Sequence, residues 1–105
     1  MCGIAGFYNA TIDRRKIKSI IGRLLHRGPD DQQSYIKNDI GLLHTRLTVI
    51  ELSKLGSQPY KFGELVLVYN GELYNYKEVR MQLELVGYSF QSNSDTEVLI
   101  KAFDR

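Results

Sequence analysis

The alternation of apolar and polar residues along the chain predicts short strands separated by amphipathic helices. An opening apolar run at 4–8 and a second at 64–69 have the length and the β-branched or aromatic content of strands. Apolar residues recur at one-face helical spacing over about 14–26, over about 75–86 and from 94 to the end. The pattern is that of a domain that combines helices and strands.

Turn and capping residues mark where these helices begin and end. Gly28-Pro29 ends the first helix, because proline cannot continue it. Residues 75–78 (Asn-Tyr-Lys-Glu) and 94–97 (Ser-Asp-Thr-Glu) have the form of capping boxes, in which a cap side chain and a glutamate three residues later bind free backbone N–H groups. Two further helices are therefore expected to start at these caps.

The middle of the chain predicts a β-hairpin followed by less regular structure. Apolar runs at 34–36 and 41–50 flank the turn-like residues 37–39, which is typical of two paired strands. An irregular stretch is expected over 53–62. The run at 88–90 predicts one more short strand.

Composition narrows the possible partners. The 105 residues carry no internal repeat or linker, so one small domain over 1–105 is expected. Fourteen basic and 12 acidic residues give a scattered net charge of +2, which argues against nucleic acid or a membrane surface as a partner. No segment approaches the roughly 18 apolar residues of a membrane helix. One cysteine and two histidines lack the spacing of a metal site, so we expect no metal and a reducing, cytoplasmic setting.

Cys2 is the only cysteine, and it directly follows the initiator Met1. Removal of Met1 would leave a thiol and a free α-amine on one residue. That residue would combine a nucleophile with a base. The alternative is that Cys2 is a small buried hydrophobic residue in the opening strand.

Polar residues within and after the predicted strands carry ambiguous signals. Arg46 lies inside an apolar strand, where a buried cation needs an anionic partner; that partner is Glu51 or another protein carboxylate, or an anionic ligand. Asn70-Gly71, at the end of a strand, is a dipeptide that readily accepts positive φ. It forms either a hairpin turn or an oxyanion hole built from the Asn70 amide and the Gly71 N–H. In the second case Glu72 would face the same site.

Three further ionisable residues have structural explanations. Asp95 lies in the first turn of a predicted helix, where the helix dipole favours an acid whether or not it binds a ligand. His26 lies near the end of the first helix, where the dipole favours a histidine without a catalytic role. His44 fits a packed or hydrogen-bonded core histidine better than a base.

Five motif-like segments occur in a fixed order along the chain: 1–6 (MCGIAG), 26–30 (HRGPD), 44–51 (HTRLTVIE), 69–75 (YNGELYN) and 94–98 (SDTEV). Together they resemble the glutaminase domain of class II glutamine amidotransferases, and the asparagine synthetase branch more than the other branches. The resemblance covers the whole chain. It implies an α+β fold, a four-layer αββα N-terminal-nucleophile sandwich of antiparallel sheets, of which this chain would be an incomplete front part with exposed edges and a possible homodimer interface.

The resemblance also implies a role for each candidate residue in hydrolysing the side-chain amide of glutamine to glutamate and ammonia. Cys2 would be the nucleophile and its own α-amine the general base. The substrate's carboxylate and ammonium groups would meet opposite charges in the protein. The implied contacts are Asn70 and Gly71 for the oxyanion, Arg46 for the α-carboxylate, Glu72 and Asp95 for the α-ammonium, and the Val49 backbone region for the pocket wall.

Three hypotheses about the function follow. In the first, the ammonia passes to a synthetase domain for asparagine synthesis or a sugar amidation; ATP and magnesium would belong to that absent domain, and this chain would need no cofactor. In the second, the chain is a truncated, non-catalytic module that acts in partner binding or self-association. In the third, it is another amide hydrolase of the same architecture, although the charged set suits a free amino acid.

Overall fold

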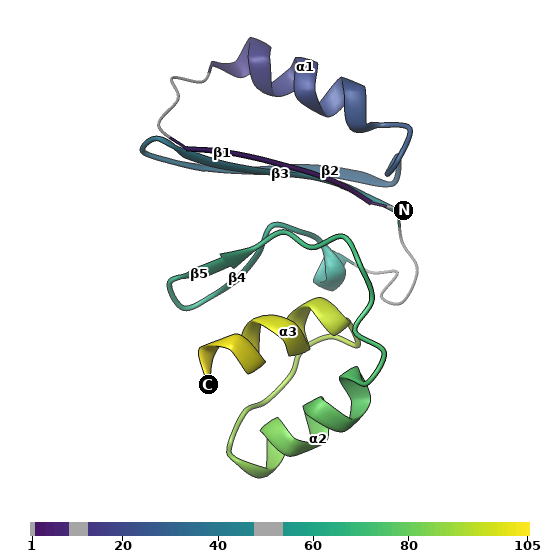
Figure 1. Cartoon of the computed structure of the whole chain (residues 1–105), viewed down its shortest axis with the longest axis vertical. Coiled ribbons are helices and arrows are strands. Elements are labelled where there is room, and N and C mark those ends of the chain that lie inside the picture. The colour runs from purple at the N-terminus through teal and green to yellow at the C-terminus, as the bar shows by residue number, and fades with distance from the viewer. Residues whose placement is uncertain (1, 9–12, 48–53) are drawn as a thin grey trace.

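A computed structural model describes residues 2–8, 13–47 and 54–105 of the chain. The elements follow in the order β1 (Gly3–Tyr8), α1 (Arg14–Leu24), β2 (Asp31–Lys37), β3 (Ile40–Arg46), a 3₁₀ turn (Lys54–Gly56), β4 (Tyr60–Phe62), β5 (Leu65–Leu67), α2 (Tyr76–Leu85) and α3 (Asp95–Asp104). In Figure 1, α1 lies on one side of the sheet formed by β1, β3 and β2. The β4–β5 hairpin lies on the other side, with α3 and then α2 beyond it. The expectation of an α+β protein with antiparallel sheets is confirmed.

The three-stranded sheet has the order β1-β3-β2, and both pairings are antiparallel. The β2–β3 hairpin is the one predicted, and Asn38 takes a positive φ of 57° in its turn. Ile4 lies opposite His44, and Asp31 lies opposite Arg46. Alternation along the strands therefore puts His44 and Arg46 on one face, with Thr45 on the face beneath α1. The predicted strand residues 48–50 lie outside the described residues.

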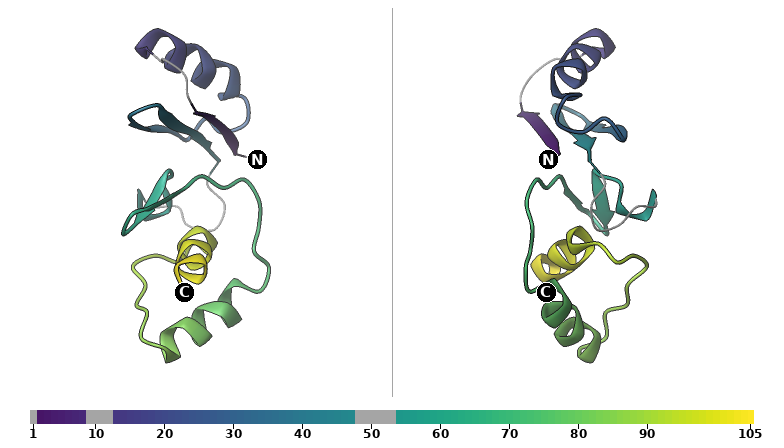
Figure 2. Two further views of the ribbon diagram at one scale, coloured as in Figure 1. Left: turned by 60° about the vertical axis from the view of Figure 1, so that its left-hand side comes forward. Right: turned by 90° about the vertical axis from the view of Figure 1, so that its right-hand side faces the viewer.

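Helix α1 is held closely against one face of this sheet (Figure 2). The Thr45 hydroxyl donates to the Leu24 carbonyl at 3.0 Å, and a Cβ on Gly3 would lie 2.6 Å from Thr45 Oγ1. A Cβ on Gly28 would lie 2.3 Å from the Thr45 backbone, so only glycine fits where the chain crosses β3. The helix ends just before Gly28-Pro29, as predicted.

The start of α3 follows the predicted cap more closely than the start of α2. Ser94 accepts the Glu97 N–H at 3.1 Å, whereas Asn75 precedes α2 without a side-chain cap bond. The predicted capping box at 75–78 is therefore wrong in its side-chain contacts, although the helix forms. Gly87, with φ of 104°, ends α2.

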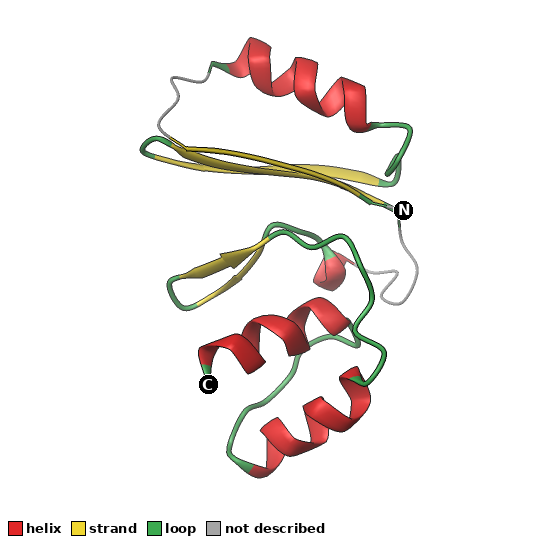
Figure 3. Ribbon diagram, in the orientation of Figure 1, coloured by secondary structure: helices red, strands yellow, loops and turns green. Residues whose placement is uncertain are grey.

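Other local predictions differ from the structure, in which the segment between α2 and α3 is a loop (Figure 3). Residues 88–90 form no strand: the Tyr88 hydroxyl instead donates to Asp104 at 2.8 Å, and the Phe90 ring lies under the Arg80 guanidinium. Strand β4 forms inside the stretch expected to be irregular. Its hairpin with β5 turns at Gly63, not at Asn70-Gly71.

The tightly buried apolar core is small, because much of the interior is polar. Leu43, Leu83, Val98 and Ile100 are buried, and Leu43 packs in the three-stranded sheet. Apolar side chains of the sheet, including Ile4, Tyr8 and Ile40, stay exposed. Among the described residues, no helix has the length and apolar character needed to cross a membrane.

Candidate active site

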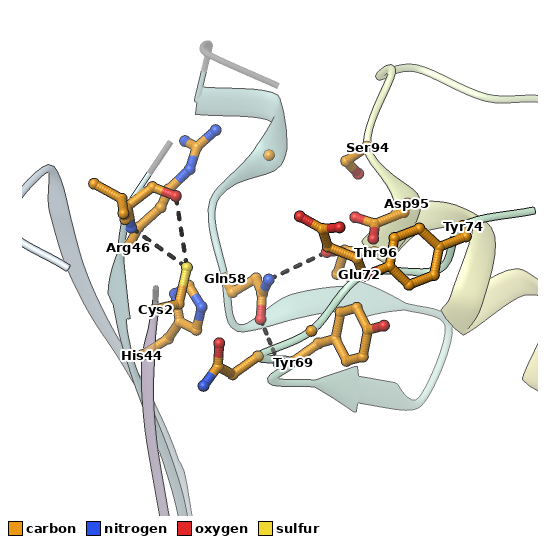
Figure 4. Close-up of a pocket in the computed structure, with 14 residues that line it drawn as sticks. Cys2, His44, Arg46, Gln58, Tyr69, Glu72, Tyr74, Ser94, Asp95 and Thr96 are labelled. Carbon is orange, nitrogen blue, oxygen red and sulfur yellow. Dashed lines mark hydrogen bonds between the residues drawn. The ribbon is translucent and has the colours of Figure 1, made fainter. Parts of the chain in front are cut away.

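A pocket of about 520 Å³ lies between the three-stranded sheet, the segment after β5 and the first turn of α3 (Figure 4). Six of the seven predicted site residues line it: Cys2, Arg46, Asn70, Gly71, Glu72 and Asp95. The seventh, Val49, lies outside the described residues. The fold therefore brings together residues from four separate parts of the chain: the start of β1, the end of β3, the segment after β5 and the first turn of α3.

The Cys2 thiol lies at the start of β1 and is held by the backbone at the end of β3. The Leu47 N–H donates to Cys2 Sγ at 3.3 Å, and the thiol lies 3.6 Å from the Leu47 carbonyl oxygen. The Arg27 Nε–H donates to the Cys2 carbonyl at 3.1 Å. These contacts place the half-buried thiol in the pocket wall.

Arg46 is 6% exposed and lines the same pocket. Its guanidinium donates to Ser57 Oγ at 3.3 Å, and the Ser57 hydroxyl donates to Asp31 at 2.9 Å. The anionic group expected opposite Arg46 thus includes Asp31, which lies across the β2–β3 ladder. Glu51, the other expected partner, lies outside the described residues.

Asn70 and Gly71 belong to an irregular segment that leads from β5 toward α2. Neither residue has a positive φ, and no strand follows them, so the hairpin-turn alternative is wrong. A Cβ on Gly71 would lie 3.1 Å from the Tyr69 ring, which leaves little room for a side chain. Burial, followed by the nearby Asp95 and Glu72 carboxylates, raises the pKa of Tyr69 above its ordinary value.

Asp95 joins this segment to α3. Its carboxylate accepts the Leu73 N–H at 3.0 Å, and the residue is 7% exposed. Figure 4 shows Glu72 and Asp95 on the α3 side of the pocket, with Cys2 and Arg46 on the sheet side. The pocket therefore carries acidic groups on one wall and a guanidinium and a thiol on the other.

His44 is 1% exposed and also lines the pocket. Its Nε2 is buried without a hydrogen-bond partner among the described residues. Burial lowers the pKa of His44 to about 4, an effect that the Tyr69 backbone partly opposes. The imidazole is therefore neutral at neutral pH, in keeping with a core histidine, while His26 does not line the pocket.

Sequence reasoning missed Gln58, which lies in the pocket wall and is 6% exposed. Its Nε2 donates to Thr96 Oγ1 at 3.1 Å, and its Oε1 accepts the Tyr69 N–H. The surrounding 53–62 stretch has no helix or strand periodicity that marks this glutamine. Among the described residues, no group of three or more His, Cys, Asp or Glu side chains is placed to hold a metal ion.

Comparison with known proteins identifies the class of this chain. A glutamine amidotransferase domain family matches residues 1–105. The asparagine synthetase [glutamine-hydrolyzing] 1 of Bacillus subtilis is 36% identical over 98% of this chain, and a putative asparagine synthetase [glutamine-hydrolyzing] 2 of Methanocaldococcus jannaschii is 32% identical over all of it. The amidase chry2 of Gibberella zeae is 32% identical over 98% of the chain.

The chain therefore belongs to the class II glutamine amidotransferase domain family. Its relatives place it in the asparagine synthetase branch. It spans only 17% and 24% of the two synthetases and 18% of the amidase.

Proposed function

We propose that this chain hydrolyses the side-chain amide of glutamine to glutamate and ammonia. The observation that carries the proposal is the shared pocket, in which a thiol, amide donors and opposite charges surround one space. The names of the relatives, glutamine-hydrolysing asparagine synthetases, support the same substrate.

The charges of the pocket suit a free amino acid. Arg46 pairs with the α-carboxylate of glutamine, while Glu72 and Asp95 pair with its α-ammonium. A volume of about 520 Å³ is ample for such a ligand.

The reaction proceeds through a thioester. Cys2 Sγ attacks the side-chain carbonyl carbon while the α-amine of the same residue takes the thiol proton. The oxyanion is bound by the Asn70 amide and the Gly71 N–H, donors of a kind that commonly contribute about 3 kcal/mol to such a transition state. The proton passes to the leaving nitrogen, the C–N bond breaks and ammonia departs. Water then attacks the thioester carbonyl, the C–S bond breaks, and glutamate and the thiol are released.

This mechanism has one requirement beyond the pocket. Met1 must be removed, since otherwise the Cys2 nitrogen is an amide and cannot act as a base. The released ammonia would then pass to a synthetase domain, with aspartate or a sugar as acceptor and with ATP and magnesium used there. We place residues 1–105 in one glutaminase domain, and we propose that the arrangement in Figure 1 corresponds to the four-layer αββα order of the N-terminal-nucleophile sandwich.

Glutamate release tests the proposal. The protein, with Met1 shown to be absent by intact mass, is incubated with glutamine beside a Cys2→Ala variant. The wild-type chain should form glutamate and the variant should form none, while the circular dichroism spectra of the two chains should be the same. Equal glutamate release by the two chains would refute the proposal, and glutamine binding without hydrolysis by both would favour the non-catalytic module.

A further inference from the structure

Gln58 connects two walls of the pocket through the two ends of its side-chain amide. On one side its Oε1 accepts the N–H of Tyr69, the residue before Asn70. On the other side its Nε2 donates to the hydroxyl of Thr96, the residue after Asp95. Both Gln58 and Thr96 are buried, at 6% and 4% exposure, so water competes little for these bonds.

The segment between Tyr69 and Leu73 is held at both ends. Gln58 binds the N–H at its start, and the Asp95 carboxylate binds the Leu73 N–H at its end. Thr96 and Asp95 are neighbours in the first turn of α3, so the contacts close a ring that runs from Gln58 through the segment and α3 back to Gln58. The residues inside the ring are Asn70, Gly71 and Glu72.

We infer that Gln58 is a positioning residue that holds the Asn70 and Gly71 donors at a set distance from Asp95. This inference rests on the proposed glutaminase function. Oxyanion donors act only when their placement matches the transition state, and a segment with no strand or helix ladder of its own needs fixing from outside. Gln58 supplies that fixing through hydrogen bonds to Tyr69 and Thr96, neither of which is the thiol or a charged group assigned to the substrate.

Thr96 offers a clean perturbation, because valine has its shape without its hydroxyl. Thr96→Val removes one bond of Gln58 directly and alters neither the two groups of the Tyr69 contact nor the charge of the pocket. We expect kcat for glutamate release to fall about fivefold, which corresponds to the net contribution of one ordinary hydrogen bond. KM for glutamine should change less than twofold. Thr96→Ser, which keeps the hydroxyl, should retain the wild-type kcat.

Gln58→Met removes both bonds and should lower kcat more than Thr96→Val does. Gln91→Met is the matched control, since Gln91 is exposed and uses only its backbone N–H in the Glu97 contacts. A wild-type kcat in Thr96→Val, or an equal loss in Thr96→Ser or Gln91→Met, would overturn the inference. If Gln58→Met fails to fold, the Thr96 pair decides alone.

Amide hydrogen exchange separates this inference from the proposed function. Thr96→Val should accelerate exchange of the Tyr69 and Leu73 amides at least severalfold, although these amides donate to Gln58 and Asp95 and not to Thr96, and Thr96→Ser should not. A wild-type chain without glutaminase activity would refute the proposed function alone. Unchanged exchange at Tyr69 and Leu73 in Thr96→Val would refute the ring, whatever the activity.

Discussion

The Glu97→Gln substitution should destabilise this protein far more than a similar change at an exposed glutamate. The Glu97 side chain is fully buried, and its carboxylate meets Lys101 Nζ at 2.6 Å. It also accepts the Ser92 hydroxyl at 2.6 Å and the backbone N–H groups of Ser92 and Gln91 at 2.8 and 3.0 Å. Burial opposes the charge, but these hydrogen bonds outweigh it and the pKa of Glu97 is lowered. Removing the charge leaves the Lys101 ammonium, itself largely buried, without its counter-ion.

The expected loss is about 3 kcal/mol of unfolding free energy, at the lower end for breaking a buried pair because glutamine keeps the shape and one acceptor. For a chain of this size that corresponds to a fall in Tm of roughly 10–20 °C. Glu84→Gln is the matched control, since Glu84 and Arg80 form a pair of the same i,i+4 spacing at 3.3 Å on the surface. The control should lose less than about 1 kcal/mol.

Urea unfolding followed by circular dichroism measures both variants against the wild type. The wild type should also lose stability as the pH falls from about 4.5 through the lowered pKa of Glu97. Over this range the unfolded chain binds a proton at Glu97 more readily than the folded chain does. Glu97→Gln should not show that part of the fall in unfolding free energy at low pH. Equal destabilisation by Glu97→Gln and Glu84→Gln would refute the reasoning.

Three further outcomes follow from the site and the exposed sheet. Arg46→Lys should raise KM for glutamine about tenfold with a smaller effect on kcat, because lysine cannot match the bidentate fork; an unchanged KM in steady-state kinetics would argue against the carboxylate contact. Burial holds the pKa of His44 near 4 against an ordinary 6.5. Between these two pH values the unfolded chain binds a proton at His44 and the folded chain does not, so the unfolding free energy should fall by about 3 kcal/mol as the pH falls from 6.5 to 4. His44→Gln should remove that loss in urea titrations, and an identical pH profile in the variant would contradict it. Homodimer formation, still a prediction, should appear in sedimentation and weaken in Tyr8→Lys, since Tyr8 is 70% exposed; a monomer at all concentrations would count against it.

Local chemistry was enough to predict the elements whose ends are defined by their own residues. Ser94 caps α3 through a contact three residues away, and Asn38 turns the β2–β3 hairpin within four residues. Gly28-Pro29 follows the end of α1 because the proline ring cannot continue a helix. In each case the deciding contact involves neighbours in the sequence or a backbone conformation that few residues adopt.

Tertiary contacts decided the rest. The 88–90 run has strand-like residues, but its Tyr88 and Phe90 side chains contact helices, and Lys101 Nζ lies 4.7 Å from the Phe90 ring centre. Strand β4 exists because β5 pairs with it, which its own composition does not reveal.

The site was predictable mainly through resemblance. Cys2, Arg46, Asn70 and Asp95 each had a structural explanation taken alone, and only their ordered occurrence pointed to one pocket. No pattern in the sequence marked Gln58, because its role depends on hydrogen bonds to Tyr69 and Thr96, which are 11 and 38 residues away.

The rate of glutamate release from the chain that begins at Cys2 tests the central claim most directly. It should be compared with the same chain carrying one uncleaved residue before Cys2, both verified by intact mass. We expect turnover only when the Cys2 α-amine is free, because that amine is the base that activates the thiol. Equal turnover by the extended chain would contradict this account of the mechanism.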